Sequence, residues 1–94
     1  METQQNIIDM ESVMRHEIQR VFGEVFIEFG FGLEVPILSD EDILLESGMD
    51  SMGFAILVTS LESELGFDPF AISEDPTYPS TFGEFVIFYE SNRP

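Results

Sequence analysis

The chain has 94 residues, 44% of them hydrophobic, which is enough apolar material for one small domain with a single core. It carries 19 acidic residues against three arginines, and its formal charge of −16 argues against nucleic acid and anionic membranes and favours basic protein partners. The chain contains no cysteine, so it forms no disulfides and has no thiol chemistry of its own.

The first predicted element is a long helix over residues 6–27. Its apolar residues recur mostly at spacings of one, three and four, the pattern of a helix that buries one face. Gly23 weakens this helix without ending it, whereas Gly30 and Pro36 mark a loop. We interpret His16 as a solvated residue, because no nucleophile or metal-ligand spacing accompanies it.

A long loop is predicted over residues 28–50. Within it Ser39 is expected to cap a short turn, with Asp42 reaching back as in a capping box. The acidic cluster formed with Asp40 and Glu41 invites a calcium interpretation, but it lacks the alternating oxygen ligands and central glycine of an EF-hand loop. We therefore expect a solvated turn and no metal site.

The second main helix is predicted over residues 51–65. Asp50 or Ser51 suits its N-cap, because a side-chain oxygen there accepts a hydrogen bond from an unpartnered backbone amide. Gly66 is a natural stop just past its end. One apolar stripe is expected to face the core and comprises Phe54, Leu57 or Val58, Leu61 and Leu65. A second, unusually apolar set lies on another face and comprises Met52, Ala55, Ile56 and Thr59.

Two further helices complete the predicted fold. A short irregular helix fits within residues 68–80, which hold three prolines, and a last helix is predicted over residues 82–90. Thr81 and Glu84 have the spacing of a capping box at the start of that last helix. The predicted fold class is all-α, a small up-and-down four-helix bundle of three main helices plus one short helix, in a single domain over residues 1–94.

Ser51 is the residue on which the function depends. A catalytic serine needs a base within hydrogen-bond reach, yet His16 is the only histidine and the chain has no lysine. The surrounding sequence is also not the G-x-S-x-G of a nucleophile elbow. We therefore expect that the protein is not an enzyme, and two interpretations of Ser51 remain: a simple helix cap, or a site that another enzyme modifies.

Three stretches carry a resemblance to a known family. They read "SDEDILLESG", then "LLESGMDSMGFAILVTSLESELGFDPF", and finally "PTYPSTFGEFVIFYE". They resemble the loop, the second helix and the closing Thr-x-Gly-x-φ-φ-x-φ helix of the acyl carrier protein family, which includes the peptidyl and aryl carrier domains. Gly48, Asp50 and Ser51 match the family's Gly-x-Asp-Ser-Leu motif, with Met52 in the leucine position. The resemblance covers nearly the whole chain.

The resemblance implies an acyl-carrier-like four-helix bundle in which Ser51 bears 4′-phosphopantetheine. A phosphopantetheinyl transferase would install this arm from coenzyme A, and Asp50 would position the transferase or its metal as well as capping the helix. The arm supplies the thiol that the chain lacks, and it carries an acyl or aminoacyl group as a thioester. Partner enzymes, which are acyl ligases, synthases or transferases, would dock mainly along the second helix.

One departure from the family bears on the choice of partner. Carriers of bacterial fatty-acid synthesis tend to have acidic residues two and five positions after the modified serine, where this chain has Gly53 and Ile56. An exposed apolar patch is therefore expected at the partner-binding face, formed by Met49, Met52, Ala55 and Ile56. This patch indicates a specialised carrier. The alternative is that Ile56 is buried beneath the irregular segment near residues 69–80.

A function of a different class stays open beside the carrier. The chain could be an acidic helical adaptor that binds a protein and is never modified, with Ser51 only a cap. In either case we expect a cytoplasmic monomer, because the N-terminus lacks the basic and apolar regions of a secretory signal and no apolar run approaches a membrane span. The cargo and the pathway are left open by the sequence.

Overall fold

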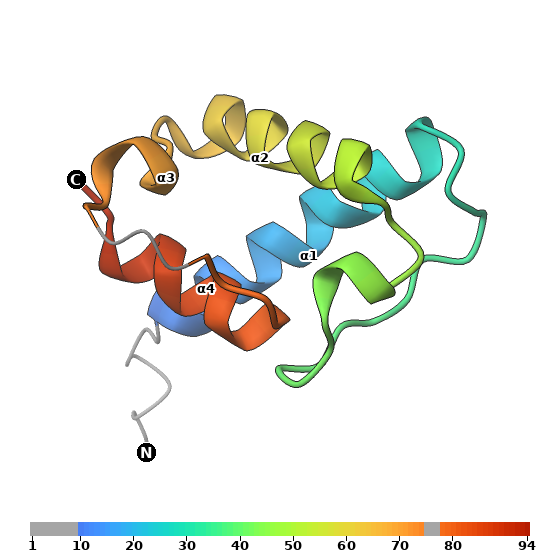
Figure 1. Ribbon diagram of the computed structural model, residues 1–94, viewed down its shortest axis with the longest axis horizontal. Coiled ribbons are helices and arrows are strands. Elements are labelled where there is room, and N and C mark those ends of the chain that lie inside the picture. The colour runs from blue at the N-terminus through green and yellow to red at the C-terminus, as the bar shows by residue number, and fades with distance from the viewer. Residues whose placement is uncertain (1–9, 75–77) are drawn as a thin grey trace, which may run out of the picture.

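Four α-helices make up most of the computed structural model, which describes residues 10–74 and 78–94 (Figure 1). They are α1 (Met10–Glu28), α2 (Ser51–Leu65), α3 (Pro69–Ile72) and α4 (Phe82–Ser91). A 3-10 helix, η2 (Leu44–Glu46), lies in the loop before α2. No strand occurs within the described residues. The prediction of an all-α fold with three main helices and one short helix is confirmed.

The helix boundaries follow the predicted ones closely. α2 covers the predicted range, and Gly66 ends it in the left-handed conformation, with φ of 86°. α1 and α4 each end one residue later than predicted, at Glu28 and Ser91, while the predicted first turn over residues 6–9 lies outside the described part of the chain. None of the helices described is long and apolar enough to cross a membrane.

The predicted capping box begins α4. The amide of Glu84 donates to Thr81 Oγ1 over 3.1 Å, and the Glu84 carboxylate accepts from the amides of Thr81 and Ser80 over 3.2 and 2.9 Å. These backbone hydrogen bonds lower the pKa of Glu84 below its ordinary value, because they stabilise the charged carboxylate.

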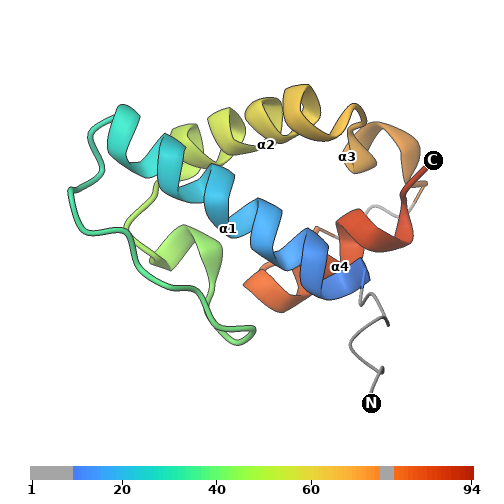
Figure 2. The same ribbon diagram turned by 180° about the vertical axis from the view of Figure 1, so that it is seen from behind.

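The core lies where α1 packs against both α2 and α4. α1 runs diagonally behind α2 and α4 in Figure 1 and in front of them in Figure 2. Phenylalanines supply much of the buried surface, and each ring removes a large apolar area from water. The most deeply buried large side chains include Met14, Ile18, Phe22, Leu57, Leu61, Phe82, Phe85, Val86 and Tyr89.

The long loop after α1 is fixed to that helix by side-chain clamps. Gln19 donates from Nε2 to the Pro36 carbonyl over 3.1 Å and accepts from the Leu38 amide at Oε1 over 2.9 Å. Arg15 makes two hydrogen bonds of 3.2 Å to the Asp40 carboxylate. The loop therefore has a defined path over α1, although it contains little regular structure.

The same loop also supports the start of α4. The amides of Phe82 and Gly83 donate to the carbonyls of Asp42 and Asp40 over 2.8 and 3.0 Å. A Cβ at Gly83 would lie 3.1 Å from the Asp40 carbonyl oxygen and 2.9 Å from Asp40 Cβ. This close approach explains the glycine in "TFGEF", since any side chain there would push the loop away from α4.

Candidate functional site

Asp50, and not Ser51, caps α2. The Asp50 side chain accepts a hydrogen bond from the Gly53 amide over 2.9 Å, and its backbone is extended, as an N-cap residue requires. Ser51 is the first residue inside the helix. The sequence left the cap open between these two residues, and the structure assigns it to Asp50.

Ser51 is exposed at the first turn of α2. Within the described part of the chain its hydroxyl has no hydrogen-bond partner. His16 is exposed on α1 and forms no catalytic pair with this serine. Among the described residues, Ser51 thus lies on the surface without the hydrogen-bonded base that a serine nucleophile requires.

Met49, the residue just before the cap, faces inward. Gly48 has φ of 102°, a conformation that favours glycine, and a Cβ there would meet the Phe26 ring at 3.2 Å. This turn directs Met49 into the core, where it is only 2% exposed. The expectation that Met49 belongs to an exposed partner-binding patch is therefore wrong.

Gly53 is also buried, and the reason is the loop after α1. A Cβ at this position would lie 2.5 Å from Met49 Cγ and 2.6 Å from Phe31 Cζ. Packing therefore excludes any side chain at Gly53, because Met49 and Phe31 occupy the space where it would start.

The expected apolar patch is smaller than the sequence suggested. Met52 is 70% exposed and Ala55 is exposed, so both are accessible to a partner. Ile56 is half-buried and packs against the core. It does not line the cavity beside the segment at residues 69–80, which lies on the side of Phe54 and Val58.

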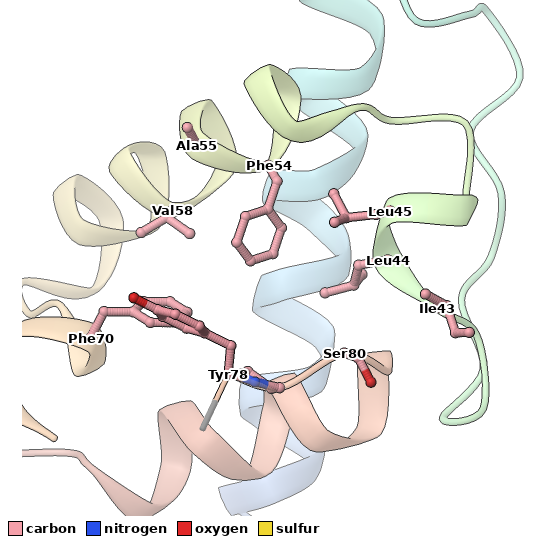
Figure 3. A pocket seen from close by; sticks show the side chains of 10 residues that line it. Ile43, Leu44, Leu45, Phe54, Ala55, Val58, Phe70, Tyr78 and Ser80 are labelled. Atoms are coloured by element: carbon pink, nitrogen blue, oxygen red, sulfur yellow. The ribbon is translucent and has the colours of Figure 1, made fainter. Parts of the chain in front are cut away.

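A cavity of about 600 Å³ opens next to the start of α2 (Figure 3). Phe54 projects from α2 into it, facing Leu44 and Leu45 of η2, while Phe70 and Tyr78 approach from the opposite side. Ile43, Ala55, Val58, Pro79 and Ser80 complete the lining. The walls are almost entirely apolar, and the exposed Leu45, Ala55 and Tyr78 lie at the rim.

Aromatic side chains from α2, α3 and α4 contact one another beside the cavity. Phe54 contacts Phe85 and Phe70 edge-on, with ring centroids 5.6 and 6.4 Å apart, and Tyr78 lies 5.5 Å from Phe70. The apolar stripe of α2 predicts Phe54 in the core and gives no sign of a cavity. The available signal was the pair of aromatic residues, Phe70 and Tyr78, inside the proline-rich segment.

The acidic cluster in the loop is used by the fold. The Ser39 amide donates to Asp42 Oδ2 over 2.8 Å, which confirms the predicted reach-back, and Asp40 pairs with Arg15. Across residues 10–74 and 78–94, no three histidine, aspartate or glutamate side chains are grouped so that they could hold a metal ion.

The structure thus brings together an exposed Ser51, the capping Asp50 and an open apolar cavity that begins one helical turn later at Phe54. Met52 and Ala55 stand beside them on the accessible surface. No protein-family model, no curated protein and no solved structure matches the chain.

Proposed function

We propose that the chain is an acyl carrier protein with the four-helix carrier fold, in which Ser51 bears 4′-phosphopantetheine. The observation that carries this proposal is the exposed Ser51 hydroxyl, which has no partner among the described residues and stands one turn from an open apolar cavity. Because Asp50 already caps α2, capping does not account for Ser51.

The residues present fit the phosphopantetheine group. Ser51 would hold it through a phosphodiester, whose negative charge is favoured at the N-terminal end of the α2 dipole. When bound, the group supplies a thiol that carries the cargo as a thioester. The chain itself would contribute the attachment oxygen of Ser51, which is exposed, and the adjacent cavity.

The cavity supports an apolar acyl cargo. Its volume of about 600 Å³ lies in the range of small-molecule sites, and its lining offers few polar groups to a polar substituent. Removing an aliphatic chain from water is worth about 0.8 kcal/mol for each buried CH₂ group. Phe54, Leu45 and Phe70 would shield such a chain while the arm is in transit between enzymes.

The accessible surface beside Ser51 supports a specialised carrier. Partners at the front of α2 would meet the apolar Met52 and Ala55, whereas the acidic Glu62 and Glu64 lie near the far end of the helix. We infer that partner enzymes recognise this front by hydrophobic contact, with the wider acidic surface providing steering.

Intact mass spectrometry tests the proposal. The chain is incubated with coenzyme A, Mg²⁺ and a promiscuous phosphopantetheinyl transferase. The transfer forms a bond between Ser51 Oγ and the phosphorus bearing pantetheine, breaks the pyrophosphate bond of coenzyme A and releases 3′,5′-adenosine bisphosphate. We expect the wild-type chain to gain the mass of one phosphopantetheine and Ser51→Ala to gain none.

Two variants sharpen this experiment. Ser63→Ala removes another exposed serine of α2 and is expected to be modified like the wild type. Asp50→Asn keeps an N-cap acceptor but removes the charge, so slower modification of a folded Asp50→Asn chain would support a role of Asp50 beyond capping. A wild-type chain that stays unmodified would contradict the carrier and favour the unmodified adaptor.

A further inference from the structure

The loop after α1 presents two aliphatic side chains to water. Leu33 is 89% exposed and Ile37 is 85% exposed, the highest values for any large hydrophobic residue in the described part of the chain. Single exposed apolar residues are common on proteins and need no explanation. We call these two residues the loop surface, because they differ from such scattered residues in how they are held.

The loop surface is held by contacts of its neighbours. Phe31 turns inward against Phe26, with ring centroids 6.0 Å apart, and Leu38 is buried. Gln19 fixes the backbone on both sides of Ile37 through its bonds to the Pro36 carbonyl and the Leu38 amide. The fold thus fixes the backbone around Ile37, and it leaves both Leu33 and Ile37 out of its own packing.

The loop surface lies at the end of the molecule where α2 begins. Figures 1 and 2 both show the loop forming the edge of the molecule beside the N-terminal end of α2. Phe31 joins the two, because it reaches the position that a Gly53 side chain would occupy. Because Ser51 is the first residue of α2, an enzyme bound over its hydroxyl would lie next to the loop.

The charges around the loop indicate what kind of surface covers it. Glu28 and Glu34 are exposed there, and neither has an ion-pair partner within the described residues. All three arginines of the chain pair with carboxylates, namely Arg15 with Asp40, Arg20 with Glu17, Glu24 and Glu64, and Arg93 with Glu90. A second copy of this chain would bring like charges together, whereas a surface bordered by lysine or arginine would complement them.

We propose that Leu33 and Ile37 form a second contact surface, beyond the front of α2, for the phosphopantetheinyl transferase that modifies Ser51. The transferase would meet them with an apolar patch bordered by basic side chains. This inference rests on the proposed function, because it assumes that such an enzyme acts at Ser51.

Kinetics of the modification test the contact. The transferase is that of the organism that makes the chain, and the variant is Leu33→Ser/Ile37→Ser. We expect its KM for the carrier to rise about tenfold with kcat little changed, as for the loss of an apolar contact in an interface. Ile87→Ser, a half-exposed residue of α4, and the conservative Leu33→Met/Ile37→Val should keep the wild-type KM. Thermal unfolding by circular dichroism confirms that each variant is folded.

Photo-crosslinking gives a second readout that does not depend on activity. In a Ser51→Ala chain, a photoreactive residue at position 37 is expected to capture the transferase, and one at position 87 is not. A KM that the double serine variant leaves unchanged, or a crosslink between two copies of the chain, overturns the inference while the carrier function stands. A wild-type chain that the transferase does not modify overturns both.

Discussion

Tyr89 is the residue at which packing and hydrogen bonding conflict. Its side chain is fully buried, and its ring lies 4.8 Å from Phe85 and 6.1 Å from Phe67, centroid to centroid. Its hydroxyl has no hydrogen-bond partner among the described residues. Burial, together with the negative charges of Asp68 and Glu62, raises the pKa of Tyr89 above its ordinary value. The aromatic contacts therefore hold a hydroxyl that the core does not satisfy.

Replacing Tyr89 by Phe is expected to leave the free energy of unfolding at pH 7 unchanged or to raise it by up to about 1 kcal/mol, because an unsatisfied buried group is removed. The pH dependence follows from the raised pKa. Above about pH 10 the unfolded chain loses the tyrosine proton while the folded chain keeps it, so the wild type loses stability as the pH rises. Between pH 7 and pH 11, Tyr89→Phe should therefore lose less stability than the wild type. Urea unfolding followed by circular dichroism at pH 7 and pH 11 measures both effects.

The matched control is Tyr78→Phe. Tyr78 is 75% exposed, so removing its hydroxyl should change the stability at pH 7 by less than about 0.5 kcal/mol. If Tyr89→Phe and the wild type lost equal stability between pH 7 and pH 11, the buried hydroxyl would not titrate as proposed.

At the scale of elements, the features with local signals could be predicted from the sequence. Asp50, Gly66, Thr81 and Glu84 mark helix ends through short-range hydrogen bonds, and the structure has helix ends at each of these places. The place of Ser51 at a helix start could be predicted for the same reason.

The contacts between distant segments could not be predicted in this way. Met49 precedes the cap, so its direction depends on the turn at Gly48 and not on helical periodicity. The burial of Gly53 depends on Phe31, which lies 22 residues earlier in the sequence. The cavity likewise forms between α2, η2 and the segment before α4, and no single stretch of sequence encodes it.

Two helical glycines test how tightly the loop packs on the helices, Gly23 on α1 and Gly53 on α2. Both replacements by alanine remove the flexibility of glycine in a helix, which alone stabilises by about 0.5–1 kcal/mol. At Gly23 the new Cβ would meet Val35 Cγ1 at an ordinary 3.4 Å, so we expect that gain. At Gly53 it would collide with Met49 and Phe31, so we expect a loss of about 1–3 kcal/mol.

Denaturant unfolding of both variants measures the difference, and hydrogen exchange shows where it arises. Gly53→Ala should raise amide exchange in the loop around Phe31 and at the start of α2, whereas Gly23→Ala should not. Stabilisation by both substitutions would mean that the loop does not press on α2 as the structure describes.

At the scale of the whole molecule, the excess negative charge opposes compaction, because like charges repel when the chain folds. Arg20 counters this repulsion between two helices. Its guanidinium lies 2.9 Å from Glu17 and 2.8 Å from Glu24 on α1, and 2.7 Å from Glu64 on α2. The hydrogen bond from Arg20 lowers the pKa of Glu17. One exposed cation thus contacts three carboxylates and offsets part of their mutual repulsion.

Arg20→Gln is therefore expected to lower the melting temperature, and the loss should depend on salt. At 0.01 M salt the screening length is about 30 Å, so the three carboxylates repel one another across the α1–α2 contact. At 1 M salt the screening length is about 3 Å, and the loss of melting temperature should fall to less than about half of its value at 0.01 M.

Arg93→Gln is the matched control, because Arg93 pairs with Glu90 near the end of the chain and joins no two of the described helices. It should lower the melting temperature less at either salt concentration. Circular dichroism melts of the wild type and the two variants in 0.01 M and 1 M NaCl measure these melting temperatures. If Arg20→Gln lowered the melting temperature equally at both salt concentrations, Arg20 would have a packing role and not an electrostatic one.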